Sequence, residues 1–321
     1  MALNKREVEK FGSDFSDLAE NIESVLFGKR TVVELVIAAM VSEGHVLLED
    51  FPGTGKTALA RALSQSVKGV SQRIQFTPDL LPGDVTGITV YDQKKGTFEF
   101  HQGPIFGNVV LADEINRASP KTQSALLEAM EEARVTVDGV TRPTGSPFLV
   151  IATQNPIEQA GTYRLPEAQL DRFMLKTSVG YPDNTSTVRI LQGTAQAASD
   201  LKAVMTLERI LGMVVIARNA FIGPQVLDYI ARLVDATRTA PQVKMGSSVR
   251  GARNLAKIAR TWALARGRSY VIPDDIKDLA EVVLAHRIVV DPEAEFDGVT
   301  ANAIIAQILL DTVPPTGTET E

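Results

Sequence analysis

The chain has 321 residues, a net charge of −6 at pH 7 and a pI of about 5.3, so no strongly basic character indicates nucleic-acid binding. Cysteine is absent, which excludes disulfides, thiolate metal sites and a thiol nucleophile. No apolar run reaches the length of a membrane span, and the N-terminus lacks the apolar core of a signal peptide. We therefore expect a cytoplasmic protein without a membrane span. The three histidines are far apart, and we assign none of them a role.

The first half of the chain alternates helical patterns with short apolar runs. Apolar and charged residues recur at helical spacing over 8–26 and 31–42, with Gly28 between the two segments. Apolar runs without polar alternation follow, which is typical of strands buried on both faces. We expect strands at 45–50, 73–76, 109–112, 148–153 and 174–179. Such strands, separated by helices, predict an α/β fold with a parallel sheet covered by helices on both faces, which binds ligands beyond the carboxyl ends of its strands.

The segment 47–57 has the pattern of a phosphate-binding P-loop. An apolar strand runs into a glycine-containing turn, then into Gly55-Lys56-Thr57 and a helical pattern. We expect Lys56 to reach the β- and γ-phosphates of ATP and the Thr57 hydroxyl to bind Mg²⁺. Backbone N–H groups would hold the phosphates at Gly53, Thr54, Gly55, Lys56, Thr57 and Ala58. The general motif begins with glycine, whereas this loop begins with Asp50.

Polar residues follow two of the later predicted strands. Asp113 and Glu114 come directly after one of them, and Asn155 follows the next. Asp113 would hold Mg²⁺ beside Thr57, and Glu114 would polarise the water that attacks the γ-phosphate. Asn155 would hold that water and a phosphate oxygen. Each pattern also has a plainer interpretation, a solvated strand end for the acidic pair and an Asn-Pro turn for Asn155.

Two arginines are candidates for stabilising charge on the transferred phosphoryl group. Arg172 precedes the last predicted strand, and Arg250 opens a long helical pattern in the second half of the chain. From there Arg250 would reach across to the γ-phosphate and report domain closure. The plainer interpretations are that Arg172 pairs with its neighbour Asp171 and that Arg250 is an exposed residue at a helix start.

The second half of the chain is helical in pattern. We expect helices at 206–219, 224–239, 249–266, 273–285 and 299–310. The sequence therefore predicts a core domain over 1–180, a C-terminal all-α lid domain over 181–313 with a hinge near Gly180, and a disordered tail over 314–321.

Two stretches of the core interrupt the alternation of strands and helices. The segments 87–103 and 135–142 each read as a β-hairpin, the second around the two-residue turn Asp138-Gly139. From the pattern alone, these hairpins could be surface elements without a specific function or elements that take part in function.

In chain order, these residues resemble the nucleotide-site motifs of the AAA+ ATPases: Walker A at 50–57, Walker B at Asp113 and Glu114, sensor 1 at Asn155, the arginine finger at Arg172 and sensor 2 at Arg250. The strings that most resemble the MoxR subfamily are 48–57, 112–118, 152–156 and 165–173. The resemblance extends over about 18–310, and MoxR-like loops often carry an acid where this chain has Asp50. One departure is that Ser-Val precedes Arg250, where the family usually has Ser-Pro.

The resemblance implies further features. Family members form rings, commonly hexamers, with ATP and Mg²⁺ bound between subunits, so Arg172, together with Arg117, would act in trans. The hairpins at 87–103 and 135–142 would be the helix-2 insertion and the pre-sensor-1 hairpin, which face the pore or the substrate side. The segment 25–28 would lie beside the adenine. The protein would then be a chaperone that remodels or activates client proteins, or inserts a metal or cofactor, often with a partner that contains a von Willebrand factor A domain.

Other functions share parts of this pattern. An ATP-gated scaffold with little turnover would not need Glu114, which is present. A chelatase subunit or a DNA-processing motor would share the hairpins, although the acidic net charge and the lack of an evident basic-aromatic stripe argue against a nucleic-acid partner. A small-molecule kinase leaves the helical domain unexplained. A GTPase would need an Asn-Lys-x-Asp motif, and the sequence has only Asn4-Lys5-Arg6-Glu7.

Overall fold

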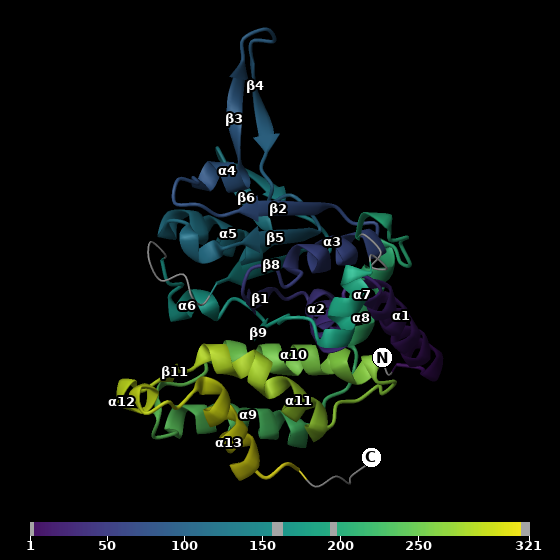
Figure 1. The fold of residues 1–321 in the computed structure, drawn as a ribbon, viewed down its shortest axis with the longest axis vertical. Coiled ribbons are helices and arrows are strands. Elements are labelled where there is room, and N and C mark those ends of the chain that lie inside the picture. Colours follow the sequence, from purple (N-terminus) through teal and green to yellow (C-terminus); the bar gives the residue numbers. More distant parts are fainter. Residues whose placement is uncertain (1–2, 156–162, 193–197, 316–321) are drawn as a thin grey trace.

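A five-stranded parallel sheet forms the centre of the computed structural model, which describes residues 3–155, 163–192 and 198–315 (Figure 1). The strands are β1 (Val46–Glu49), β2 (Ser71–Gln75), β5 (Val109–Asp113), β8 (Leu149–Gln154) and β9 (Leu175–Thr177). They lie in the order β2-β5-β8-β1-β9, and every neighbouring pair is parallel. All five carboxyl ends therefore lie at one end of the sheet, the carboxyl end, and all five amino ends lie at the opposite, amino end.

Helices cover both faces of this sheet because successive strand residues point to opposite sides. The covering helices are α1 (Lys5–Glu23), α2 (Arg30–Val41) and α3 (Lys56–Ser66) on one face and α4 (Pro82–Thr86) and α5 (Pro120–Glu132) on the other. In β5, Val109 and Leu111 belong to the first apolar layer, whereas Val110 and Ala112 belong to the second. A strand packed on both sides is apolar at every position, and this confirms the predicted α/β class.

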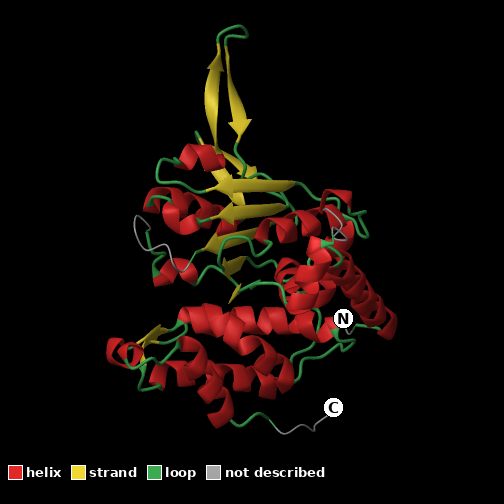
Figure 2. Ribbon diagram, viewed as in Figure 1, coloured by secondary structure: helices red, strands yellow, loops and turns green. Residues whose placement is uncertain are grey.

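The layer below β9 is helical, green to yellow in Figure 1, and consists mainly of α9 (Pro224–Thr239), α10 (Val249–Ala265), α11 (Pro273–Leu284) and α13 (Ala301–Asp311). It also contains the short elements β10 (Val243–Met245), β11 (Val289–Val290) and α12 (Pro292–Phe296). The helices α7 (Asn184–Leu191) and α8 (Leu207–Arg218) lie beside α1 and α2, and α6 (Glu167–Leu170) lies beside the core; Figure 2 shows the helices in red and the strands in yellow. Within the described ranges, no helix is long and apolar enough to cross a membrane.

One apolar cluster runs without interruption from the core helices into this lid. It includes Val36 of α2, Met213 of α8 and Ile258 of α10, all of which are buried. The predicted division of the chain at residue 180 therefore remains a prediction. Most of the expected disordered tail, residues 316–321, lies outside the described residues.

Two antiparallel hairpins occur within the described part of the core. The first, β3 (Gly87–Asp92) with β4 (Thr97–Gln102), projects beyond β2 at the top of Figure 1. The second, β6 (Arg134–Val137) with β7 (Val140–Pro143), turns at Asp138 and Gly139. Both turn residues have positive φ, 51° and 76°, which is the backbone twist that a tight two-residue hairpin turn requires.

His45, which precedes β1, joins the amino end of the sheet to α5. Its Nδ1 accepts a 3.0 Å hydrogen bond from the Val150 N–H, and its Nε2 lies 2.9 Å from the Met130 carbonyl oxygen. These two partners fix the neutral tautomer with the proton on Nε2. Burial, assisted by the nearby Lys257 charge, lowers the pKa of His45 to about 4. This structural role of His45 was not predicted from the sequence pattern.

We expect the free energy of unfolding to decrease as the pH falls from about 6.5 towards 4. In this window the unfolded chain protonates His45 while the folded chain keeps the imidazole neutral, so acid favours unfolding. The full contribution is present above pH 6.5 and is on the order of 3 kcal/mol. Urea unfolding followed across this pH range measures it.

The variant His45→Gln is the control for this pH dependence. This variant should be less stable than wild type at neutral pH. Its free energy of unfolding should also decrease less than that of wild type as the pH falls from about 6.5 towards 4. The slope that remains would include His286, another buried residue whose pKa is lowered well below the usual value, mainly by burial. An acid slope identical to that of wild type would contradict the assignment to His45.

Candidate functional site

The P-loop at 50–55 joins β1 to α3 at the carboxyl end of the sheet. Gly53 and Gly55 have φ values of 83° and 94°, conformations that are strained for any residue with a Cβ. Because α3 begins at Lys56, its first backbone N–H groups are available to an anion in the loop. The Lys56 ammonium donates to the backbone carbonyls of Asp50 at 3.1 Å and Phe51 at 3.2 Å, so it lies within the loop.

Asp50, the residue that departs from the general motif, anchors the start of the loop. It is buried, and its carboxylate accepts hydrogen bonds from the Val179 N–H at 2.6 Å and the Gly180 N–H at 2.9 Å. Both donors lie just beyond β9, where the chain leaves the sheet. A glycine at position 50 would leave these two N–H groups without acceptors. This explains structurally why the chain has an aspartate where the general motif has glycine.

The Asp113 carboxylate is held from two sides at the end of β5. The buried Thr153 hydroxyl of β8 donates to Oδ1 at 2.7 Å, and the Arg73 guanidinium of β2 pairs with Oδ2 at 2.6 Å. Thr153 also accepts a 2.9 Å hydrogen bond from the Glu114 N–H, so one side chain orients both acidic residues. Thr57 and Arg73 line the same cavity of about 360 Å³, which places the start of α3 near this pair.

Glu114 has an unusual backbone conformation for a residue with a side chain. Its φ is 58°, in the left-handed region, and such strain is concentrated at functional sites. Its Oε2 pairs with Arg117 at 2.9 Å. Asn155 follows β8, the strand between β5 and β1, and so lies between the acidic pair and the P-loop. The five predicted residues Lys56, Thr57, Asp113, Glu114 and Asn155 therefore gather at one end of the sheet.

The oxygen atoms of this group fit a magnesium ion. A threonine hydroxyl at position 57 and a carboxylate at position 113 are the hard ligands that Mg²⁺ prefers in nucleotide sites. Both Asp113 oxygens already have partners, however, so an ion next to Oδ2 has to displace Arg73. The Arg73 side chain is 50% exposed and has room to move away.

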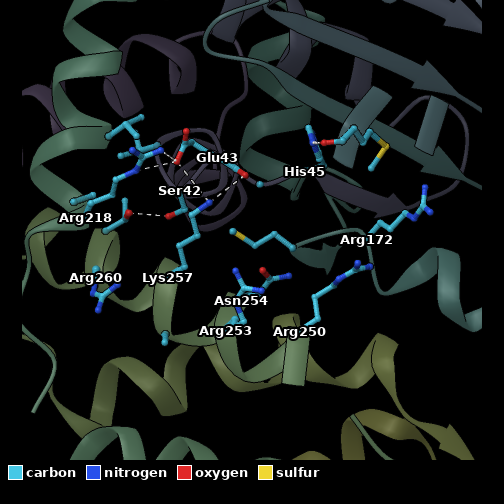
Figure 3. Close-up of a pocket in the computed structure, with 18 of the residues that line it drawn as sticks. Ser42, Glu43, His45, Arg172, Arg218, Arg250, Arg253, Asn254, Lys257 and Arg260 are labelled. Carbon is cyan, nitrogen blue, oxygen red and sulfur yellow. Dashed lines mark hydrogen bonds and ion pairs between the residues drawn. The ribbon is translucent and has the colours of Figure 1, made fainter. Parts of the chain in front are cut away.

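Arg172 and Arg250 lie at the amino end of the sheet. The Met174 N–H donates to the carbonyl of His45, immediately before β1, and this contact places Arg172 at that end. Arg250 is in the first turn of α10. Glu131, in the last turn of α5, pairs with both arginines, with N–O distances of 3.4 Å to Arg172 and 2.7 Å to Arg250. Figure 3 shows the two arginines together at one side of a cavity.

Their position at the amino end of the sheet separates Arg172 and Arg250 from the P-loop of the same chain, which lies at the carboxyl end. The four residues of β1 alone span about 13 Å at 3.3 Å per residue. From its observed place beside Arg172, Arg250 therefore does not reach the P-loop of its own chain, and its expected contact with a γ-phosphate stays a prediction. The alternative pairing of Arg172 with Asp171 does not occur either, because Arg287 pairs with Asp171 and Glu131 pairs with Arg172.

The segment 25–28, expected beside the adenine, lies against the P-loop. A Cβ added to Gly55 would come within 3.2 Å of the Leu26 side chain. The Phe27 carbonyl accepts a hydrogen bond from Ser186 of α7, which fixes this segment to the chain beyond β9. An apolar surface with backbone groups is thus present next to the phosphate-binding loop.

Sequence reasoning missed three side chains that organise the two ends of the sheet. Thr153 was assigned only as part of an apolar strand, although a lone hydroxyl in such a strand is a signal for a buried hydrogen bond. Arg73 and Glu131 gave no signal, because their partners come from distant segments that only the fold brings together.

Comparison with known proteins finds relatives over nearly the whole chain. Residues 45–175 match a family model described as "ATPase family associated with various cellular activities (AAA)", and residues 235–308 match an AAA lid domain. The chain is 50% identical to the protein YeaC of Bacillus subtilis over 90% of this chain and 91% of that protein. It is 41% identical to Chaperone MoxR1 of Mycobacterium tuberculosis over 90% of this chain and 79% of that protein. The crystal structure of a proposed ATPase from Cytophaga hutchinsonii superposes with a TM-score of 0.90 at 37% identity, covering 97% and 98% of the two chains.

We expect Asp50→Gly to lower the stability of the protein and its affinity for nucleotide, although this change restores the general P-loop motif. The change removes the acceptors of two backbone N–H groups, which should cost about 1–3 kcal/mol of stability and lower nucleotide affinity. Urea unfolding and nucleotide titration measure the two effects. Asp50→Asn, which keeps one acceptor oxygen, should lie between wild type and Asp50→Gly, and a glycine variant as stable as wild type would refute the anchoring role.

Proposed function

Because this chain belongs to the MoxR family of AAA+ ATPases, we propose that it hydrolyses ATP with Mg²⁺ at sites shared between the subunits of a ring, most simply a hexamer. We propose further that it uses this hydrolysis as a chaperone to remodel or activate client proteins. The family is shown by the relatives described above. The catalytic activity, the ring and the clients are inferred from the site and from the relatives' names.

The observation that carries the proposal is the alignment of Asp113 and Glu114 by Thr153 at the same end of the sheet as Lys56. In the proposed reaction the Lys56 ammonium and the first N–H groups of α3 hold the phosphates. The Glu114 carboxylate polarises the attacking water and takes its proton, while the Asn155 amide orients that water.

Mg²⁺ would be held by the Thr57 hydroxyl and by Asp113, directly or through water, and would neutralise charge on the β- and γ-phosphates. The Arg73 guanidinium pairs with the Asp113 carboxylate and compensates its charge. We propose that Arg73 moves away from Oδ2 when the magnesium nucleotide binds. Thr153 keeps its contact with Oδ1 throughout, so the carboxylate stays oriented.

The position of the two arginines supports a site completed by a neighbour. Arg172 and Arg250 carry the charge that phosphoryl transfer needs, but they lie across the sheet from their own P-loop. In a head-to-tail ring two different faces of the subunit meet, and we propose that the amino end of one sheet faces the carboxyl end of the next. Both arginines would then act in trans on the neighbour's nucleotide, held together by Glu131 until that nucleotide binds. The same geometry leaves Arg117 beside its own Glu114.

The projecting hairpin is the proposed contact with client proteins. Tyr91 of β3 and Phe98 of β4 are 51% and 74% exposed, and their rings lie 5.1 Å apart across the hairpin. Ile88 and Val90 of β3 are also exposed, but they lie on the opposite face of the hairpin, because successive strand residues point to opposite sides. Exposed large apolar side chains on a projecting element indicate an interaction site. We propose that it binds exposed apolar segments of clients, among which partners with a von Willebrand factor A domain are candidates.

We expect Glu114→Gln and Arg172→Ala each to bind ATP but to lose turnover by on the order of a thousandfold. When the two variants are mixed in equal amounts and assemble at random, most rings contain both kinds of subunit. At roughly a quarter of the sites, a subunit with intact Glu114 then lies next to a neighbour with intact Arg172. Steady-state phosphate release from the mixture should therefore recover to roughly that fraction of wild type. Each variant mixed with itself is the control, and a mixture as inactive as its components would rule out a shared site.

We expect Phe98→Ser with Tyr91→Ser to separate ATP turnover from client handling. The hairpin is remote from the P-loop, so basal phosphate release should stay within about twofold of wild type, while suppression of the aggregation of a heat-unfolded model protein should be lost. Val140→Ser, which removes an exposed apolar residue from the second hairpin, is the matched control. Undiminished suppression in the double variant would show that clients bind elsewhere.

A further inference from the structure

A cavity of about 520 Å³ lies between the amino end of the sheet and α10, across the sheet from the P-loop (Figure 3). Its lining includes two acidic side chains, Glu43 and Glu131, and six basic ones: Arg172, Arg218, Arg250, Arg253, Lys257 and Arg260. A chain with a net charge of −6 thus concentrates positive charge in one place. The nucleotide site explains only two of these residues, Arg172 and Arg250.

Four of the basic residues come from one face of α10. Arg250, Arg253, Lys257 and Arg260 are spaced three or four residues apart, so they form a single row along the helix. Like charges at this spacing repel one another and destabilise a helix. A row of this kind therefore costs stability unless an anion lies against it.

The two glutamates are too few to balance the row. Glu43 is shared by Arg218 at 2.5 Å and Lys257 at 3.7 Å, and Figure 3 shows this group at one end of the cavity. Glu131 is shared by Arg172 and Arg250 at the other end. Each acid already serves two cations, which leaves the middle of the cavity without negative charge.

The middle of the cavity contains donors without acceptors. Among the described residues, neither Arg253 nor Asn254, which lie in the centre of Figure 3, has an ion pair or a side-chain hydrogen bond. The buried Nε of Arg260, at the Arg218 side of the cavity, also has no hydrogen-bond partner. Lys257 is partly withdrawn from water, and burial lowers its pKa. Desolvated cations and unpaired buried donors are costly, and a bound anion would relieve both costs.

We propose that this cavity binds a small anion with two or more phosphate groups, at a site separate from the P-loop. Guanidinium groups match phosphate oxygens in pairs, and the volume is within the range of small-molecule sites. No Phe, Tyr or Trp is among the described residues that line the cavity, so the site would recognise the phosphates rather than a nucleobase.

Inorganic pyrophosphate is the probe, titrated calorimetrically into the full-length Lys56→Ala protein so that the P-loop contributes little. We expect saturable binding that Arg253→Ala weakens about tenfold or more and that added salt also weakens. Arg253 is exposed, and alanine favours a helix, so this variant should fold normally. Arg232→Ala, which removes an exposed arginine from α9, is the matched control and should leave the affinity unchanged.

Arg253→Glu should abolish pyrophosphate binding, and ADP should bind no more tightly than pyrophosphate. The proposal is wrong if pyrophosphate does not bind, or if both Arg253 variants bind it as the Lys56→Ala protein does. If Arg253→Glu instead disrupts the assembly seen by light scattering while pyrophosphate fails to bind, the cavity receives a second copy of the chain. None of these readouts depends on ATP turnover, so they are independent of the proposed ATPase activity.

Discussion

The parallel pairing of β1 with β8 on one side and β9 on the other determines the arrangement of everything functional in this protein. Parallel strands place all their carboxyl ends together, and the P-loop, Asp113 and Glu114 follow from that. They also place all their amino ends together, and there Arg172 and Arg250 lie. One sheet thus presents the P-loop and the two arginines in opposite directions, and in the proposed ring a complete site is formed by two chains.

At each end of the sheet, buried polar contacts across strands give these groups their orientation. Asp50 ties the P-loop to the segment after β9, and Thr153 of β8 orients Asp113 at the end of β5. At the amino end, His45 links β8 to α5, whose last turn carries Glu131. Because each contact is buried and joins different elements, the loss of one partner leaves an unpaired group rather than a solvated one.

The sequence predicted the α/β class, the strands and the residues at the carboxyl end, because these depend on local patterns. The run at 109–112, for example, shows a buried strand by its lack of alternation, and Asp113 is its neighbour in the chain. Contacts between distant segments could not be predicted in this way. Glu131 contacts Arg250, 119 positions away in the sequence, and the cavity beside the cationic row of α10 forms only because distant segments of the core lie opposite that helix. The same limitation explains why the position of Arg250 beside Arg172, at the amino end of the sheet, was not predicted.

The apolar cluster that joins core and lid limits how this molecule can move. Leu255, Ile258 and Trp262 of α10 are buried in it together with side chains of α1, α2 and α8. Lifting the lid away would expose such residues at a cost of roughly 2 kcal/mol for each large side chain. In the proposed ring, each subunit should therefore behave as one stiff block while nucleotide is bound and released. Mechanical work would then come from the sliding and rotation of whole blocks against each other, with the flexible joints located where one chain meets the next.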